Sequence, residues 1–196
     1  MQGKKILLTV LGGIAAISIG ASASALEMSA PNGWYLEGNL GSAHLSNSNF
    51  DGASTSSSGI GGNANLGYKF MPYAGMEIGY SQYPTTKINA SDGTRIGSAK
   101  HYSYDIAAKG IIPISDSGFE AFAKLGAQHI QTRLTNDNSS FDISGSHSST
   151  GLYMGVGGQL NIMPELGIVV QWQRAQGSSS TGTEDLYSVG LAFMFI

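Results

Sequence analysis

Apolar side chains alternate with polar or small ones in eight segments of the chain, and successive side chains of a β-strand point to opposite faces. In the first segment, Trp34, Leu36 and Leu40 share one face, whereas Glu37 and Asn39 share the other. The remaining segments cover residues 60–70, 74–81, 101–112, 119–130, 152–162, 166–173 and 187–195. The pattern therefore predicts an all-β protein of eight strands.

A soluble β-sandwich also alternates, so other features must separate it from a transmembrane barrel. Phe122 and Ile130 blur the alternation of the fifth segment. The polar face of the segments is nevertheless rich in Gly, Asn, Gln and Ser with isolated charges, as expected of a narrow lumen. The segments reach about ten residues, which is enough to cross a bilayer when strands tilt. Both features favour the barrel.

The connections between segments alternate between short and long. The short ones are 71–72, 113–117 and 163–164, and the long polar ones are 46–58, 83–98, 132–149 and 175–184. Short periplasmic turns and long external loops are typical of outer-membrane barrels. We therefore predict an eight-stranded antiparallel up-and-down transmembrane β-barrel with periplasmic termini and extracellular loops, and closure leaves no strand edge in lipid.

The start of the chain has the layout of a secretory signal peptide. Lys4 and Lys5 precede an apolar stretch over 6–19 and a small-residue run that ends at Ala25. We predict cleavage after Ala25, which divides the chain into a signal peptide (1–25) and a barrel domain (26–196). The remaining eight basic and 13 acidic residues give a formal charge of -5, which argues against a nucleic-acid partner. The chain has no cysteine and hence no disulfides.

Both ends of the predicted barrel resemble the OmpA-type family of small outer-membrane barrels. The opening Gly33-Trp-Tyr-Leu-Glu-Gly-Asn-Leu-Gly41 is similar to that family's first strand. The ending is similar to the family's terminal assembly signal, with its polar residue, glycine and alternating aromatic residues at Ser188, Gly190, Phe193 and Phe195. The chain departs from the pattern by adding Ile196 after the last aromatic residue.

The resemblance implies a membrane-structural or surface-interaction protein without a cofactor. Its implied partners are the lipid and lipopolysaccharide of the outer membrane, the barrel assembly machinery, and a host or surface ligand contacted through the loops. No second domain follows Ile196, so we do not expect the peptidoglycan-binding module of larger relatives.

The polar face collects a nearly balanced set of charges: Glu37, Lys69, Glu77, Asp105, Lys109, Glu120 and Lys124. Unpaired charges inside a narrow barrel would be costly. If the fourth and fifth segments pair across residues 114–115, Asp105 lies opposite Lys124, and the same register places Lys109 opposite Glu120. We hypothesise that these pairs limit conductance as a salt-bridge gate. The alternative is a hydrated lumen that the charges line without specific pairing.

Other candidate sites are weaker. His101 and Ser103 invite comparison with a barrel enzyme that modifies lipid A, but both fall on the lumen face, away from lipid. His44 and His129 lie near strand ends and His147 in a loop, without metal-ligand spacing. Three loop residues with oxygen ligands, Asp137, Asn138 and Asp142, miss the calcium-loop pattern. We therefore predict neither a catalytic nor a metal site.

The sequence thus favours a non-enzymatic barrel with a lumen filled by side chains, because eight strands enclose little space. A small pore or a route for apolar solutes is the first alternative, and a lipid A-modifying enzyme is a more distant one.

Overall fold

The computed structural model describes residues 30–50, 53–89, 95–114, 117–136, 145–178 and 181–195. The predicted signal peptide therefore lies outside the described residues. Within these ranges the chain forms one antiparallel sheet of nine strands: β1 (Gly33–Phe50), β2 (Ala53–Met71), β3 (Ala74–Gln82), β4 (Thr86–Asn89), β5 (Arg95–Ile114), β6 (Phe119–Asn136), β7 (Gly145–Met163), β8 (Leu166–Gln176) and β9 (Thr183–Phe195). In the part of the chain that is described, no helix is long and apolar enough to cross a membrane.

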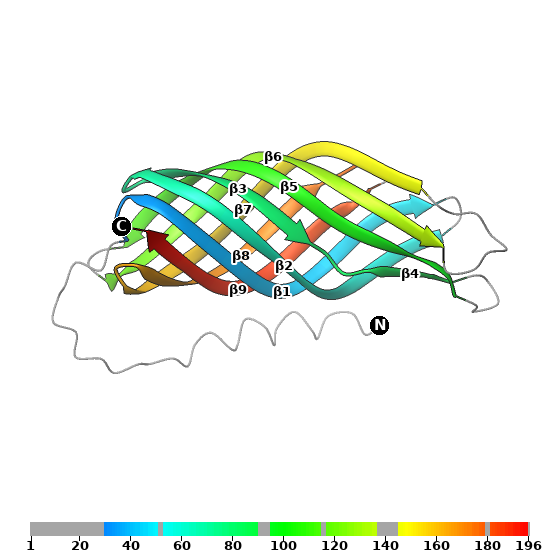
Figure 1. Ribbon diagram of the computed structural model, residues 1–196, viewed down its shortest axis with the longest axis horizontal. Helices are drawn as coiled ribbons and strands as arrows, with labels where there is room; N and C mark the ends of the chain where they lie inside the picture. Colours follow the sequence, from blue (N-terminus) through cyan, green and yellow to red (C-terminus); the bar gives the residue numbers. More distant parts are fainter. Residues whose placement is uncertain are drawn as a thin grey trace, which may run out of the picture.

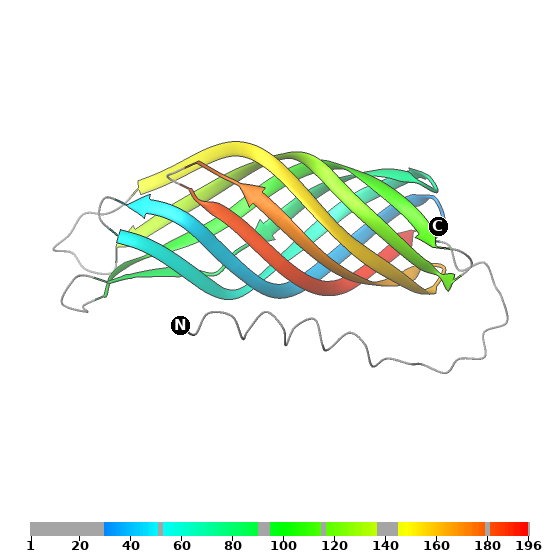
Figure 2. The ribbon, with the colours of Figure 1, turned by 180° about the vertical axis from the view of Figure 1, so that it is seen from behind.

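The sheet closes on itself, as Figures 1 and 2 show from opposite sides. Each strand pairs with its neighbour in sequence except that β3 pairs with β5 rather than with β4, and β1 pairs with β9. Because β3 and β4 pair successively with the same strand, β5, they are two parts of one barrel strand. The predicted eight-stranded up-and-down barrel is confirmed.

The interruption between β3 and β4 spans residues 83–85. Pro84 has no backbone N–H to donate to the ladder, and proline in a sheet is confined to such irregular positions. The Tyr83 backbone N–H still donates to the His101 carbonyl oxygen at 3.0 Å. The Tyr83 side chain is buried inside the barrel.

The two faces of the barrel wall have the polarity that the alternation predicts. Leu40 and Ile60 point outward and are 69% and 83% exposed, whereas Glu37 and Lys124 point inward and are 0% and 2% exposed. A soluble sandwich would bury the apolar face instead. Exposed apolar side chains around a polar interior are the arrangement of a barrel that lies in lipid.

We call the end where the short connections lie the turn end, at the left of Figure 1, and the opposite end the loop end. The turn end joins β2 to β3, β5 to β6 and β7 to β8, through residues 72–73, 115–118 and 164–165. The connections at the loop end are shorter than the sequence predicts, because much of each predicted loop forms strand. For example, β1 and β2 remain paired up to Phe50 and Ala53. Beyond the lipid the outer face of a strand meets water, so the apolar period disappears while the backbone pairing continues.

Outward-facing aromatic residues form a girdle near each end of the apolar band. The turn-end girdle contains Trp34, Tyr68, Phe70, Tyr73, Phe119, Phe193 and Phe195, and the loop-end girdle contains Tyr80, Tyr102, Tyr104, Trp172 and Tyr187. Ring centroids lie 5.1 Å apart for Trp34 and Tyr68, and 5.3 Å apart for Tyr80 and Tyr104. Such girdles mark the two membrane interfaces. The strands extend past the second girdle at the loop end.

Candidate functional site: the filled lumen

Four charged side chains from four strands meet in the middle of the lumen. The Lys109 Nζ atom lies 3.4 Å from Glu37 and 2.9 Å from Glu77. The Lys124 Nζ atom lies 3.3 Å from Glu37 and 2.7 Å from Glu77. None of the four residues is more than 4% exposed. Each lysine thus contacts both glutamates, and we call this group the charge ring.

Neutral groups complete the surroundings of the charge ring. The Glu37 Oε1 atom accepts hydrogen bonds from Asn39 at 2.8 Å and from Asn65 and Gln171 at 3.1 Å. The Tyr35 hydroxyl donates to Glu77, and the Lys109 ammonium lies 4.4 Å from the centre of the Phe122 ring. Hydrogen bonds and cation–π contacts of this kind offset the loss of water around buried charges.

The predicted pairing of charges between β5 and β6 is wrong. Lys109 lies directly opposite Lys124, Asp105 opposite Gln128, and Pro113 opposite Glu120. The reason is the position of the hairpin: its centre falls between residues 116 and 117, not between 114 and 115, which moves the register by four residues. The two facing lysines are tolerated because their counter-charges come from β1 and β3, across the lumen.

The other two lumen lysine and glutamate residues form a separate pair near the turn end. The Lys69 ammonium lies 2.9 Å from Glu120 and also donates to the Ala30 carbonyl oxygen at 3.0 Å. Asp105 differs from the six charged residues in these two groups. Among the described residues it forms no ion pair, and its Oδ2 atom has no hydrogen-bond partner.

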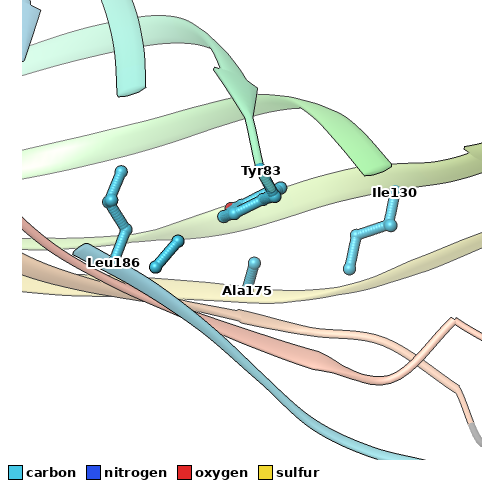
Figure 3. Packing of buried hydrophobic residues seen from close by; sticks show 5 residues of the cluster. Tyr83, Ile130, Ala175 and Leu186 are labelled. Atoms are coloured by element: carbon cyan, nitrogen blue, oxygen red, sulfur yellow. The ribbon is translucent and has the colours of Figure 1, made fainter. Parts of the chain in front are cut away.

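Apolar layers close the lumen on both sides of the charge ring. Toward the loop end, Ala43, Tyr83, Ile130, Ala175 and Leu186 form a cluster inside the barrel (Figure 3). Toward the turn end, the buried apolar residues are Ile111, Phe122, Val169 and Ala192, together with Ala30, Tyr35 and Met194. Phe122 and Ile130, which blurred the alternation, therefore point inward as parts of these layers.

Glycine makes room for the largest lumen side chains. A Cβ atom at Gly67 would overlap the Tyr35 ring, which crosses over this glycine toward Glu77. Two grooves of about 560 and 320 Å³ are lined mainly by residues of the outer wall, such as Trp34 and Tyr73. Inside the barrel, the charge ring and the apolar layers on both sides of it fill the lumen with side chains.

A second polar group lies at the loop end, beyond the outward girdle. The His101 Nδ1 atom lies 3.1 Å from the Thr132 hydroxyl oxygen and 3.6 Å from Glu184. Burial lowers the pKa of His101 to about 4. Burial, assisted by the nearby Asp185 charge, raises the pKa of Glu184 to about 8. At pH 7 both side chains are therefore mainly neutral, so their contact is not an ion pair.

Sequence reasoning missed Glu184 because it assigned residues 175–184 to a loop. The available signal was the continued alternation of Glu184, Leu186 and Ser188 on the inner face of β9. The structure places His101 and Ser103 inside the barrel, 4% and 1% exposed.

The remaining histidines lie apart from the lumen. His44 and His129 contact Ser58 and Thr150 on the neighbouring strands, at 2.8 and 3.0 Å. His147 was predicted in a loop but is exposed at the start of β7, since that strand begins earlier than expected. Asp137, Asn138 and Asp142 lie outside the described residues. Among those described, no three His, Cys, Asp or Glu side chains are grouped for metal binding.

The residues of the assembly-signal pattern lie on β9. Phe193 and Phe195 face outward at the turn end, with ring centroids 5.4 Å apart. Ser188 faces the lumen and is 6% exposed. Gly190 pairs with Asn39 of β1 across the seam that closes the barrel.

The closed antiparallel wall, the apolar outer band and the polar filled interior define a small transmembrane barrel of the bacterial outer membrane. The sequence matches the family described as "Outer membrane protein beta-barrel domain" over residues 13–195. The chain belongs to this family, and the resemblance to OmpA-type barrels is confirmed. No curated protein matches the sequence.

Several solved structures share the fold. Ail, the attachment invasion locus protein of Yersinia pestis, in complex with the heparin analogue sucrose octasulfate, is similar with a TM-score of 0.60 and 19% identity over 84% of this chain and 100% of Ail. Neisserial surface protein A has a TM-score of 0.61 and 17% identity over 83% of this chain and 97% of its own. The N-terminal barrel domain of Pseudomonas aeruginosa OprF has a TM-score of 0.57 and 14% identity over 84% and 98%.

Proposed function

We propose that this protein is a non-conducting outer-membrane barrel that presents its loop end at the cell surface for binding. In this orientation the turn end and both termini face the periplasm. The observation that carries the proposal is the charge ring, in which Glu37, Glu77, Lys109 and Lys124 meet across the lumen.

A conducting path through the lumen would require the charge ring to separate. Each buried ion that loses its partner costs several kcal/mol even after the surroundings relax. The apolar cluster around Ile130 and Leu186 would have to open as well, because it lies between the charge ring and the loop end. Both layers favour a closed structural barrel over the alternative of a small pore.

A surface role is supported by the polar strand extensions beyond the loop-end girdle. Lys100 of β5 lies directly opposite Arg133 of β6, and both side chains are exposed. The Arg133 guanidinium is held 5.7 Å from the centre of the Tyr102 ring. Two adjacent cations just above the apolar band suit the phosphate groups of lipopolysaccharide. Ail, a barrel of the same fold, has been crystallised with a sulfated sugar, so anionic ligands at this end are the first class to test.

Assembly by the barrel assembly machinery is a further part of the proposal. The support is the position of Phe193 and Phe195 on the last strand, at the turn end.

Single-channel recording in planar bilayers tests the closed lumen. We expect the native protein and Lys100→Ala, which removes an exposed charge, to be silent. Lys124→Ala leaves Glu37 and Glu77 with one ammonium between them, and we expect brief openings from the fraction that folds by circular dichroism. Steady conductance of the native protein would contradict the proposal and favour the pore.

A further inference from the structure

Three lumen-facing residues form a row across neighbouring strands. Asn65 of β2 is the register partner of Gly79 of β3, and Gly79 is the register partner of Asp105 of β5. Because Gly79 has no side chain, the two flanking side chains lean over it from both sides. The next residue in the row is Gln128 of β6.

Oxygen atoms of Asn65 and Asp105 converge over Gly79, and the hydrogen-bond donor beside them is the Asn63 Nδ2 atom, which lies 3.5 Å from the Asn65 Oδ1 atom. The Asn65 Oδ1 atom and both carboxylate oxygens of Asp105 each lie 2.6 Å from the point that a Cβ atom of Gly79 would occupy. Asn65 is held in this orientation because its Nδ2 atom donates to Glu37 at 3.1 Å. Asp105 is 8% exposed, and its Oδ2 atom has no hydrogen-bond partner among the described residues.

The neighbouring Gln128 shows the same lack of a donor. Its Nε2 atom donates to the Gln176 carbonyl oxygen at 3.0 Å, and its Oε1 atom has no partner in the described part of the chain. Buried acceptors in folded proteins are nearly always satisfied. Two orphaned oxygens on adjacent residues of one row therefore call for a group that satisfies acceptors, which a hydrogen-bond donor or a cation can do.

The charge balance indicates how much positive charge is needed. In the middle of the lumen, Lys109 and Lys124 are both engaged by Glu37 and Glu77. When it is ionised, Asp105 adds a third carboxylate to these two ammonium groups, which leaves one negative charge in a poorly solvated space. An uncompensated buried charge is costly. One monovalent positive charge would remove this cost.

We propose that Asp105 and Asn65 bind one monovalent cation of the Na⁺ type on the lumen side of Gly79. A carboxylate and amide oxygens are the ligands that hard cations prefer. The charge of the site selects a singly charged ion. A single proton could bridge only one pair of these oxygens. The site is independent of any surface ligand and goes beyond the role proposed for the loop end.

The test is the urea unfolding midpoint of the refolded protein in detergent micelles, measured in NaCl and in tetramethylammonium chloride at equal ionic strength. A ligand that binds only the folded state raises stability with the logarithm of its concentration. We therefore expect the midpoint to rise with Na⁺ concentration and not with the bulky cation. Asp105→Asn, which keeps the shape and removes the charge, should abolish this dependence.

Glycine variants give a second, matched comparison. Gly79→Ala places a methyl group where the oxygens converge and should also abolish the Na⁺ dependence. Gly38→Ala, where a Cβ atom would meet nothing within 4 Å, should keep the Na⁺ dependence.

Line broadening of ²³Na resonances by the folded native protein checks the same site without unfolding. If Na⁺ and tetramethylammonium act alike on the native protein, or if Asp105→Asn retains the Na⁺ effect, the proposal is overturned. A stability gain at low pH alone, lost in Asp105→Asn, would assign the site to a proton and also overturn it.

Discussion

Lys109 and Lys124 lie directly opposite one another on β5 and β6, yet both ammonium groups are neutralised by residues of other strands. Like charges that face each other across a strand pair normally destabilise a sheet. Here Glu37 and Glu77 reach both lysines across the lumen, so the hairpin depends on the rest of the barrel for its charge balance. The ring thus links β1, β3, β5 and β6, and a closed narrow barrel is the architecture that permits such a link.

The first prediction concerns the coupling within this ring. Lys124→Met leaves Glu37 and Glu77 sharing one ammonium group, and we expect it to lower the free energy of unfolding by about 3–5 kcal/mol. The measurement is urea unfolding of the refolded protein. The control, Lys100→Met, changes an exposed cation on the outside of the same hairpin, and we expect an effect within about 0.5 kcal/mol.

A double-mutant cycle with Glu77→Gln tests whether the ring acts as a unit. The double variant removes one charge of each sign. Its loss in free energy of unfolding should therefore be smaller than the sum of the losses of Lys124→Met and Glu77→Gln, by at least about 0.5 kcal/mol. Strictly additive effects would mean that Lys124 and Glu77 do not interact in the folded protein, despite the 2.7 Å distance between their charged groups.

The sequence predicts the faces of the barrel better than it predicts the contacts. The period of a strand is two, so parity alone assigned Glu37, Lys109 and Lys124 to the lumen. The register of β5 and β6 could not be derived in the same way, because it depends on a turn centre that differs by two residues from the predicted one. The Lys124–Glu37 contact joins residues 87 positions apart, and it depends on strand tilt and stagger, which no local pattern records.

The loop end shows a different limit of sequence analysis. Glu184 belongs to a strand extension whose outer side chains no longer need to be apolar, so the alternation that defines a membrane strand becomes weak there. Tyr83 keeps the inward parity of Glu77 and Ser81 of β3, and its backbone N–H donates to the His101 carbonyl oxygen, although the sequence analysis assigned residues 83–98 to a loop. Both residues continue the inward alternation of an adjacent strand segment, but their contacts inside the lumen depend on the pairing of β3, β5 and β9.

The second prediction concerns the packing of Tyr35 over Gly67. Gly67→Ala would place a methyl group inside the space of the Tyr35 ring and displace its hydroxyl from Glu77. We expect a loss of about 1–3 kcal/mol in the free energy of unfolding, as for other overpacked interiors. Gly110→Ala is the matched control, because the nearest atom to its Cβ would be 4.0 Å away. Equal stabilities of the two variants would show that the Tyr35 side chain can adopt another conformation that avoids the added methyl group.

The third prediction is a loss of stability as the pH rises. The pKa of Glu184 is about 8 in the folded barrel and about 4.5 in an exposed chain, because burial disfavours the charged form. The folded state therefore binds the proton more tightly, and this stabilisation is complete below pH 4.5 and is lost by pH 8. Burial lowers the pKa of His101 from 6.5 to about 4, so His101 reduces the free energy of unfolding as the pH falls, and only below about pH 6.5.

Between pH 6.5 and 8 the contribution of Glu184 is thus separate from that of His101. In this window the free energy of unfolding of the native protein should fall with pH more steeply than that of Glu184→Gln, which cannot ionise at this position. The difference should reach up to about 1.4 kcal/mol per pH unit. Urea unfolding at several pH values measures the difference. Glu165→Gln, in the turn between β7 and β8, should follow the native curve. Parallel curves for the native protein and Glu184→Gln would mean that Glu184 is already ionised when the barrel is folded.

The fourth prediction concerns the basic pair above the loop-end girdle. Lys100 and Arg133 are adjacent and exposed, and in the described part of the chain neither forms an ion pair with an acidic residue, whereas Arg174 is bound by both carboxylate oxygens of Asp185 at 2.9 Å. If the first pair contacts lipopolysaccharide phosphates, the double variant Lys100→Ala with Arg133→Ala should lose about 1 kcal/mol of binding free energy per cation. Co-sedimentation with lipopolysaccharide-containing vesicles at low and high salt measures this loss.

The control is Arg174→Ala, which should bind as the native protein does, because the charge of Arg174 is already neutralised. An equal loss in both variants, or a loss that salt does not alter, would show that the pair makes no specific electrostatic contact with the lipid.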